Sequence, residues 1–384
     1  NELCDGDFHT AHQAAGAIAN LLEDIDTHDD MVRAGTASTL LKLLGYGSVQ
    51  IAREATRGLA NLLTRLESHN LILRGSGEHV GSVIRLARSE DNEQRYYAGL
   101  LLRKLSPNFS SHENIINNGG LKSLAFLAGD RDAKVRQQAA MALRDICANP
   151  RFKTKCAKEG IIETTKKLLR SDDEVEQTLA LAIARHLSID NDLKRPIVLS
   201  GLAKLAIRCA EHSANKPDLQ CQSAGLFANL SEDMANQVSL VEQGVTSALV
   251  MLGRVRNDEV MQDSARAFAN LTSNEENHMT VYRHGGLQCL IYLTNVAEDD
   301  ITKRYAAMGL RFLSSNPEVR VHIVKEDLLE PFLKLAHSDN LDYQRTAAHA
   351  LSSFSMNGVN KMRLVQQGGL TNMLRSVKFN DLEL

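Results

Sequence analysis

The sequence contains no tryptophan, and only 4% of its 384 residues are aromatic. So few rings argue against a stacking surface for single-stranded nucleic acid. The formal net charge is only −3, so composition indicates neither a nucleic-acid partner nor an anionic membrane. If the chain binds a partner, we expect another protein.

Cysteine and proline are also scarce, with six residues each. The cysteines show no CxxC pairing, which favours a reduced, intracellular chain. We expect the cytoplasm, with the cytoskeleton or the nucleus as alternatives. No apolar run approaches the roughly 20 residues that span a bilayer, so no membrane insertion is expected. No signal-like segment opens the chain, which starts with Asn1, and we expect a fragment.

Catalytic patterns are missing as well. The glycine-rich segment 75–81 follows no predicted strand, so we do not interpret it as a phosphate-binding loop. His278, His284 and Cys289 are close in sequence but span two predicted helices, and we interpret the histidines as helix-end or surface residues rather than as a metal site. The paired acids Asp172–Asp173 and Asp299–Asp300 fall in predicted turns between second and third helices, where solvated charge and helix capping explain them. We expect no enzyme, no cofactor and no metal.

What the chain does contain is a repeated unit, seen most clearly in residues 234–274. Two short apolar-periodic segments are separated by Gly244, and a longer one runs from Val260 to Leu271. The spacing is close to 3.6 residues, so it predicts three helices. Alone, such a unit cannot bury its apolar face and needs a copy of itself on each side.

Copies of the unit occur along the chain at a period of 40 to 43 residues, which is typical of helical solenoids. The third helices share the patterns AIANLL (17–22), GLANLL (58–63), LFANLS (226–231) and AFANLT (267–272). Asp327 takes the place of glycine once. The glycine between the first and second helices recurs at Gly35, Gly77, Gly119–Gly120, Gly160, Gly201, Gly244, Gly285–Gly286 and Gly368–Gly369.

The recurring glycine and the asparagine near the end of the third helix resemble the armadillo repeat family, which includes β-catenin, plakoglobin, importin-α and the yeast vacuolar armadillo scaffold. The resemblance implies an all-α, right-handed α-solenoid of three-helix repeats. We expect a single domain over 9–378, with partial repeats at 9–23 and 359–378 and terminal segments 1–8 and 379–384. The eight full repeats are expected at about 29–66, 70–107, 113–149, 153–190, 192–232, 234–274, 276–316 and 318–356.

Two stretches depart from the period. Residues 209–220 are polar and contain Pro217, so they predict a lengthened, exposed loop between a second and a third helix. Residues 105–114 predict a longer join between repeats, with Pro107 ending the preceding helix.

The resemblance implies that third helices line a concave groove, and positions i, i+4 and i+8 then share one face. The asparagine amide can donate to and accept from an extended peptide backbone, although it could instead bond to a neighbouring turn. Asparagine is replaced in the middle by Lys104, Asp145 and His186, and towards the end by Phe312 and Ser353. We therefore predict two peptide-contact regions separated by a chemically different centre. The alternative is ordinary drift of a repeat whose middle binds nothing. The predicted groove residues are Asn20, Arg53, Arg57, Asn61, Tyr96, Lys104, Gln137, His186, Asn229, Gln262, Arg266, Asn270, Arg304 and Arg345.

The position one turn before asparagine bears on the partner. Importin-α-like proteins place tryptophan there to hold basic import signals, whereas this chain has Arg57 and Arg266. Arginine favours carboxylates or phosphates, and this resembles the basic groove of β-catenin. Alternatively, these arginines pair with neighbouring acids such as Glu54 and Asp263.

The sequence therefore predicts a non-enzymatic scaffold that binds extended or helical segments of other proteins, acidic or phosphorylated ones in particular. The alternative is a structural component of a cytoskeletal or ciliary assembly that uses the convex face and the repeat ends. A nuclear import adaptor is disfavoured by the missing tryptophans. The oligomeric state is left open.

Overall fold

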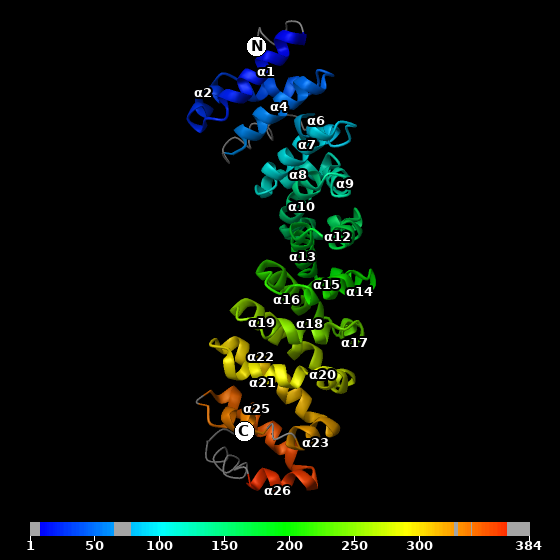
Figure 1. The fold of residues 1–384 in the computed structure, drawn as a ribbon, viewed down its shortest axis with the longest axis vertical. Coiled ribbons are helices and arrows are strands. Elements are labelled where there is room, and N and C mark those ends of the chain that lie inside the picture. Colours follow the sequence, from blue (N-terminus) through cyan, green and yellow to red (C-terminus); the bar gives the residue numbers. More distant parts are fainter. Residues whose placement is uncertain (1–7, 65–77, 326–328, 339, 367–384) are drawn as a thin grey trace. The chain divides into compact units, whose positions relative to one another are not determined.

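The computed structural model describes residues 8–64, 78–325, 329–338 and 340–366. These residues form helices and turns without a β-strand, as the sequence predicts. The chain divides into two compact units, residues 1–190 and 191–384. Their boundary follows the helix that ends at Ser188, at a predicted junction between repeats (Figure 1).

Unit 1 begins with α1 (Phe8–Leu21), the lone third helix expected there. The helices that follow form a repeated series of two short helices and one long helix, and Gly77 and the first helix of the repeat at 70–107 lie outside the described residues. They are α2 (His28–Arg33), α3 (Thr36–Leu43), α4 (Val49–Leu62), α6 (Glu78–Leu86), α7 (Asn92–Leu105), α8 (Phe109–Asn117), α9 (Gly120–Leu127), α10 (Ala133–Ala148), α11 (Lys153–Lys158), α12 (Ile161–Leu169) and α13 (Glu174–Ser188).

Unit 2 continues the same series. Asp327, Gly368–Gly369 and the last helix predicted at 370–378 lie outside the described residues. The helices are α14 (Asn191–Leu199), α15 (Leu202–Glu211), α16 (Pro217–Ser231), α17 (Met234–Glu242), α18 (Val245–Leu252), α19 (Asp258–Thr272), α20 (His278–Arg283), α21 (Gly286–Val296), α22 (Asp300–Ser315), α23 (Pro317–Lys325), α24 (Glu330–Ala336), α25 (Leu341–Ser355) and α26 (Gly358–Gln366).

The recurring glycine has the backbone role that its spacing suggests. Gly35, Gly119, Gly160, Gly201, Gly244 and Gly285 each precede a second helix with φ between 79° and 97°. An L-residue pays about 1–2 kcal/mol for this left-handed conformation, whereas glycine adopts it freely. The glycines therefore fix the turn that starts each second helix.

The third helices pack in sequence along each unit: α1, α4, α7, α10 and α13 in unit 1, and α16, α19, α22 and α25 in unit 2. Their contact faces are small and apolar. Ala98, Ala139 and Ala180, for example, are fully buried at equivalent positions of three successive helices. Asp173 and Asp299 cap α13 and α22 by accepting from the backbone amides of Glu176 and Thr302, as predicted.

The prediction of a lengthened, exposed loop at 209–220 is wrong. Helix α15 extends to Glu211 and α16 begins at Pro217, so only residues 212–216 connect them. Cys209 and Ala210 are buried in α15, and Leu219 is buried in α16. Pro217 occupies the first turn of α16, where its missing amide hydrogen is not needed.

The longer join predicted at 105–114 is also wrong, because α8 already begins at Phe109. Asn108 caps this helix by accepting from the Ser110 amide. Helix α7 does end at Leu105, just before Pro107, as expected.

Candidate functional site: the third-helix face

The structure places all of the predicted groove residues on third helices. Asn20 and Arg304 are exposed and the others are half-buried. We call the surface formed by these positions the third-helix face. Its side chains are anchored at their base by the packed helices and keep part of their surface accessible.

Arg57 is the centre of a polar cluster that joins α1 to α4. Its guanidinium donates to the Glu54 carboxylate at 2.7 and 3.0 Å, to Glu23 Oε1 at 2.8 Å and to Asn20 Oδ1 at 2.7 Å. Glu54 is one turn earlier in α4, whereas Asn20 and Glu23 belong to the preceding repeat. We call these four residues the first arginine cluster.

The same arrangement recurs in unit 2 around Arg266, between α16 and α19. Its guanidinium donates to Glu232 Oε1 at 2.7 Å, to Asp263 Oδ1 at 2.9 Å and to Asn229 Oδ1 at 3.1 Å. These four residues form the second arginine cluster, and Glu232 also accepts from Lys194 at 2.5 Å.

The sequence left two interpretations of these arginines: binding of a partner's carboxylates or phosphates, or pairing with neighbouring acids. In the structure, they pair with neighbouring acids. Each guanidinium faces two carboxylates, so neither cluster carries a net positive charge of its own. Both also hold an asparagine oxygen of the preceding repeat. Arg57 and Arg266 therefore act first as links between successive repeats.

Two further asparagines also bond across repeats. Asn61 Nδ2 donates to the Ala19 carbonyl at 3.3 Å, and Asn270 Nδ2 donates to Ser231 Oγ at 3.1 Å. The alternative role, a bond to the neighbouring repeat, thus occupies the Nδ2 group of each asparagine side chain. The Oδ1 atoms of Asn61 and Asn270 accept no hydrogen bond from any described residue.

The remaining predicted groove residues are less closely grouped. Arg53 is ion-paired with Glu93, and Gln137 Nε2 lies 3.4 Å from Asp173. Tyr96 packs edge-on against Tyr97, with their ring centroids 5.4 Å apart. In unit 2, Arg304 and Arg345 approach Asp342 to 3.8 and 3.7 Å. The described contacts of Gln262, Lys104 and His186 include no hydrogen bond or ion pair.

The centre of unit 1 differs from both clusters. The residue just before the asparagine position is arginine on three successive third helices: Arg103, Arg144 and Arg185. Sequence analysis missed this row because it followed the asparagine frame alone, although the patterns LRKL, LRDI and ARHL carry it. Burial lowers the pKa of His186, and the positive charges of Lys153, Arg185 and Arg144 lower it further against a weaker opposing effect of Asp145.

Histidines in the first helices have a structural role. The Nε2 atoms of His28, His112 and His278 lie 3.0, 2.6 and 2.7 Å from carbonyl oxygens at the end of the preceding third helix. Gln237 makes the same bond, to Ser231, from the equivalent position. These buried side chains satisfy carbonyls that a helix end leaves without partners.

The three residues considered for a metal each have a separate environment. His278 is buried at the start of α20, His284 is exposed after it, and Cys289 is buried in α21. Burial raises the pKa of the Cys289 thiol to about 12, which disfavours the thiolate that a metal needs. Over the described ranges, no group of three His, Cys, Asp or Glu residues has an arrangement suited to a metal ion.

His112 supplies a pH-dependent component of stability. Burial lowers its pKa, while a hydrogen bond to the Ser106 carbonyl and the Asp145 charge act in the opposite direction. Asn149 Nδ2 lies 3.1 Å from His112 Nδ1, which suits the neutral ring. The unfolded chain restores a pKa near 6.5, so it binds more protons below that pH. Stability from this residue is complete above pH ~6.5 and is lost as pH falls through the lowered folded pKa.

We therefore expect a difference between the parent chain and His112→Gln that depends on pH. Glutamine retains the donor, as Gln237 does, but does not titrate. The advantage of the parent chain in unfolding free energy should shrink as pH falls from about 8 to about 5. Urea titrations at several pH values measure it, and a constant difference would contradict the prediction.

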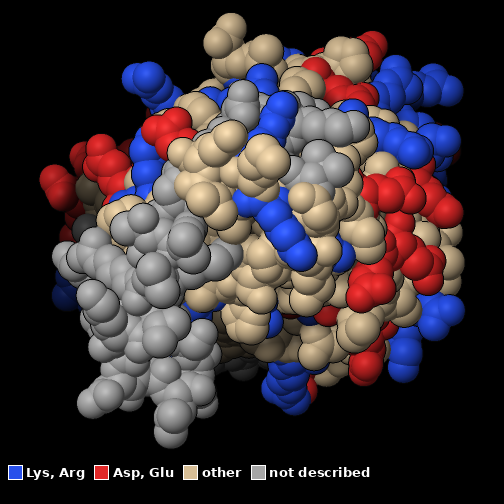
Figure 2. Space-filling view, turned by 90° about the horizontal axis from the view of Figure 1, so that it is seen from below, with Lys and Arg blue, Asp and Glu red and all other residues tan. Residues whose placement is uncertain are grey.

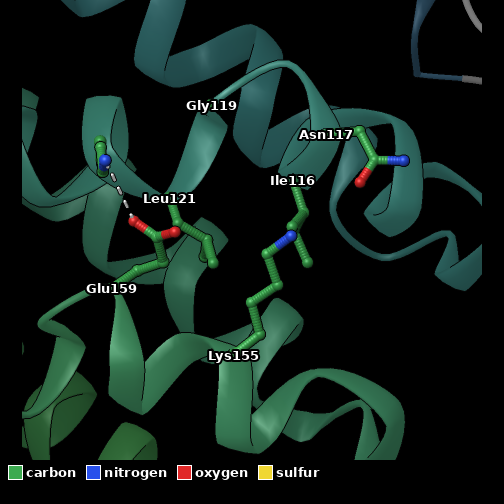
Figure 3. A pocket seen from close by; sticks show the side chains of 7 residues that line it. Ile116, Asn117, Gly119, Leu121, Lys155 and Glu159 are labelled. Atoms are coloured by element: carbon green, nitrogen blue, oxygen red, sulfur yellow. Dashed lines mark ion pairs between the residues drawn. The ribbon is translucent and has the colours of Figure 1, made fainter.

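Two small cavities in unit 1 are lined by none of the predicted groove residues. The first, of about 280 Å³, is lined by α8, α9 and α11, and Lys155 reaches across it toward Ile116 (Figure 3). Its other charged residues, Lys122 and Glu159, form an ion pair of 3.7 Å. The second, of about 360 Å³, lies beside the ion pair of the half-buried Arg136 and the buried Glu176. Neither combines a large apolar cavity with converging reactive groups.

The helix series, the glycine turns and the stacked third helices define a solenoid of armadillo repeats. Comparisons agree with this class. No protein-family model matches the chain. Human armadillo repeat-containing protein 3 is 25% identical over 185 residues, which make up 47% of this chain and 21% of that protein. The chain therefore matches about a fifth of the length of this relative.

Solved structures show the same fold. The crystal structure of an engineered protein superposes with a TM-score of 0.79 at 25% identity, covering 100% of this chain and 94% of that one. A designed armadillo repeat protein superposes with a TM-score of 0.56 at 20% identity, over 61% of this chain and 99% of the design. Together with the repeat frame, these likenesses show that the chain has the fold of an armadillo repeat solenoid. None of the described helices is long and apolar enough to cross a membrane.

Proposed function

We propose that this chain is a non-enzymatic scaffold whose third-helix face binds extended segments of partner proteins. The observation that carries the proposal is a row of half-buried polar side chains, repeated once per repeat along packed third helices. Armadillo repeat solenoids serve as interaction scaffolds, and this chain has their fold.

Asn61 and Asn270 support a role for the row in holding a peptide backbone. Each uses its amide nitrogen within the solenoid and keeps an acceptor oxygen. A peptide N–H can donate to such an oxygen without regard to the neighbouring side chain. We propose two contact regions of this kind, one in each unit, with a different chemistry in the centre of unit 1.

The distribution of charge favours a protein partner over nucleic acid. On the face shown in Figure 2, basic side chains of the described residues are scattered among uncharged ones, and acidic side chains lie on both sides of the view. A nucleic-acid partner would require a broad basic surface. The formal charge of −3 points the same way.

A site-specific photo-crosslinker tests the proposal. Gln262 is a suitable position because it lies on the third-helix face and outside both arginine clusters. Met251, on the second helix of the same repeat and 43% exposed, is the matched control. Segments selected from a random peptide library for binding to the whole chain would be irradiated with each variant.

We expect the selected segments to be captured at position 262 at least about tenfold more than at position 251, because capture requires contact with the probe. Equal capture at both positions, or a preference for position 251, would reject binding at the third-helix face. It would favour the alternative of an assembly component that uses its other surfaces.

A further inference from the structure

We propose that Ser171 is a phosphorylation site and that its phosphate binds in the cavity of about 360 Å³ beside it. Ser171 lies in the turn between α12 and α13, is half-buried and lines this cavity. The cations that line it are Arg136, Lys167 and Arg170, and we call it the cation cavity. The inference goes beyond the proposed function and does not depend on it, because the cavity is lined by none of the predicted groove residues.

The preceding repeat already contains the contact that such a phosphate would make. Asp130 occupies the position of Ser171 one repeat earlier. Its Oδ1 accepts from the Asp132 amide at 2.9 Å, as Ser171 Oγ accepts from the Asp173 amide at 3.2 Å. Its Oδ2 accepts from Arg95 Nε on α7 at 2.5 Å. An anion at this position therefore joins its turn to the preceding third helix.

The pKa of Asp130 agrees with this role. Burial raises the pKa of its carboxyl, but hydrogen bonds from Arg95 and from the Asp132 amide outweigh burial, so the pKa lies below its ordinary value. The surroundings of this position thus stabilise negative charge, although the side chain is partly buried. A phosphate offers three acceptor oxygens and more negative charge to the same kind of surroundings.

Arg136 is the counterpart of Arg95 for Ser171. Each guanidinium donates through Nη1 to two carbonyl oxygens in the turn before its own helix, so both have the same placement on α7 and α10. Arg136 also contacts Glu176 through Nε and Nη2, at 2.9 and 2.8 Å. The described contacts leave one hydrogen of Nη2 without an acceptor, and a phosphate oxygen would take it.

The lining of the cation cavity has more positive than negative charge. Lys167 and Arg170 are exposed, and their side chains form no hydrogen bond or ion pair with any described residue. Glu176 is the one carboxylate among the lining residues, and the nearby Asp173 caps α13 by accepting from the Glu176 amide. Three cations against one lining carboxylate match a phosphate, whose charge near pH 7 is about −1.5 to −2.

The residues after Ser171 fit a protein kinase that selects acidic substrates, because Asp172, Asp173 and Glu174 follow it directly. In the reaction, Ser171 Oγ forms a bond to the γ-phosphorus of ATP. The bond from this phosphorus to the oxygen that bridges it to the β-phosphorus breaks, and ADP leaves with that oxygen. The hydroxyl proton passes to the catalytic carboxylate of the kinase.

Ser89 provides a matched control, because it occupies the same position in the turn before α7. Its Oγ accepts from the second amide after it, at 3.1 Å. The two α12 cations have basic counterparts there, Arg85 and Arg88. The counterpart of Arg136, however, is Ala52, which is buried in α4. A phosphate on Ser89 would therefore lack the arginine of the preceding third helix.

The first test places phosphoserine at position 171 or 89 of the full chain by nonsense suppression and titrates the phosphate by ³¹P NMR. At position 171 the phosphate should bind its proton at least about threefold more weakly in the folded chain than in the same chain unfolded in urea, because folding brings Arg136 to the dianion. At position 89 this change should stay below about twofold. Lys167→Gln/Arg170→Gln replaces exposed side chains, so it should remove most of the change at position 171 without unfolding the chain.

The second test treats the unmodified chain with ATP and an acidophilic protein kinase and locates phosphate by mass spectrometry. We expect phosphate on Ser171. Asp172→Asn should slow its uptake at least about fivefold, because the acid directly after the serine is lost. Glu242→Gln removes an exposed acid of unit 2 and should leave the rate unchanged.

Uptake only at other serines or threonines would overturn the modification site. Binding in the cation cavity would be overturned by equal proton binding in the folded and unfolded chains, by an equal change at positions 171 and 89, or by a full change in Lys167→Gln/Arg170→Gln. Capture of segments at position 262 is measured separately on the unphosphorylated chain. The scaffold function can therefore fail while the phosphorylation site stands, and the reverse.

Discussion

Replacing Phe268 by alanine should lower the stability of unit 2 by about 3–5 kcal/mol, the usual cost of removing a fully buried phenylalanine. Phe268 lies on α19 with no exposed surface. This helix packs against α16 and α22 and also contacts α17, α18 and α21, so the cavity would open at the junction of several elements. The ring also lies close to Gly286, where a methyl group would come within 3.2 Å of it. The side chains around the ring therefore have little freedom to collapse into the space.

The location of the effect is as informative as its size. In a solenoid each repeat contacts mainly its neighbours, so a defect loosens the adjacent repeats first. Hydrogen exchange should speed up in α16, α19, α21 and α22 and stay unchanged in α7 and α10 of unit 1. Denaturant titration gives the overall loss.

Phe126→Ala is the matched control, because this phenylalanine on α9 is 55% exposed. It should change stability by less than about 0.5 kcal/mol. A loss for Phe268→Ala as small as that of the control would contradict the packing described for α19. So would equal acceleration of exchange in both units.

The fold could be predicted because its signals are local and repeated. The glycine before each second helix marks a left-handed residue, which only glycine adopts without cost. Eight copies of one pattern also correct one another, so a weak repeat is placed by its neighbours. The polar composition of residues 209–220 favours a loop, and this prediction is wrong because composition does not show which of their side chains are buried. The apolar side chains of Cys209, Ala210 and Leu219 instead extend the helices on both sides.

The third-helix face could be predicted as a set of positions, but not as a set of contacts. Helical spacing places Arg57 and Asn61 on one face, yet it does not show which acids a long side chain reaches in the preceding repeat. For both Arg57 and Arg266, the glutamate partner lies 34 residues earlier in the sequence and the asparagine partner lies 37 residues earlier. The signal was present as an identical spacing of Asn, Glu, acid and Arg in both units, and it becomes visible only when two distant repeats are compared.

This distinction also decides how binding should be tested. Substituting Arg57 and Asn61 would remove bonds that link α4 to α1, so a loss of binding could follow from a loss of structure. Gln262 is a better probe, because its described contacts include no hydrogen bond or ion pair that joins the repeats. Functional positions on a solenoid are thus best chosen among side chains that the scaffold does not itself use.

Replacing Glu232 by alanine should cost about 2 kcal/mol, whereas the equivalent change of Glu23 should cost less than about 1 kcal/mol. Both glutamates accept from the arginine of their cluster. Glu232 also accepts from Lys194 Nζ at 2.5 Å, and only 4% of the Lys194 side chain is exposed. Without Glu232, this buried ammonium would keep a single described partner, Asn191 Oδ1 at 2.8 Å. Glu23 accepts from no lysine among the described residues, and 61% of its side chain is exposed.

A double-mutant cycle separates the buried charge from the ion pair itself. Lys194→Met removes the ammonium and keeps the length of the side chain, so adding it to Glu232→Ala should recover about 1 kcal/mol or more. Urea titrations of the two single variants, the double variant and Glu23→Ala provide the comparison. Equal losses for Glu232→Ala and Glu23→Ala, or no recovery in the double variant, would show that Lys194 is solvated and not held by Glu232. Recovery would instead establish that the second arginine cluster is stabilised by a buried lysine that the first one lacks, although their four defining positions match.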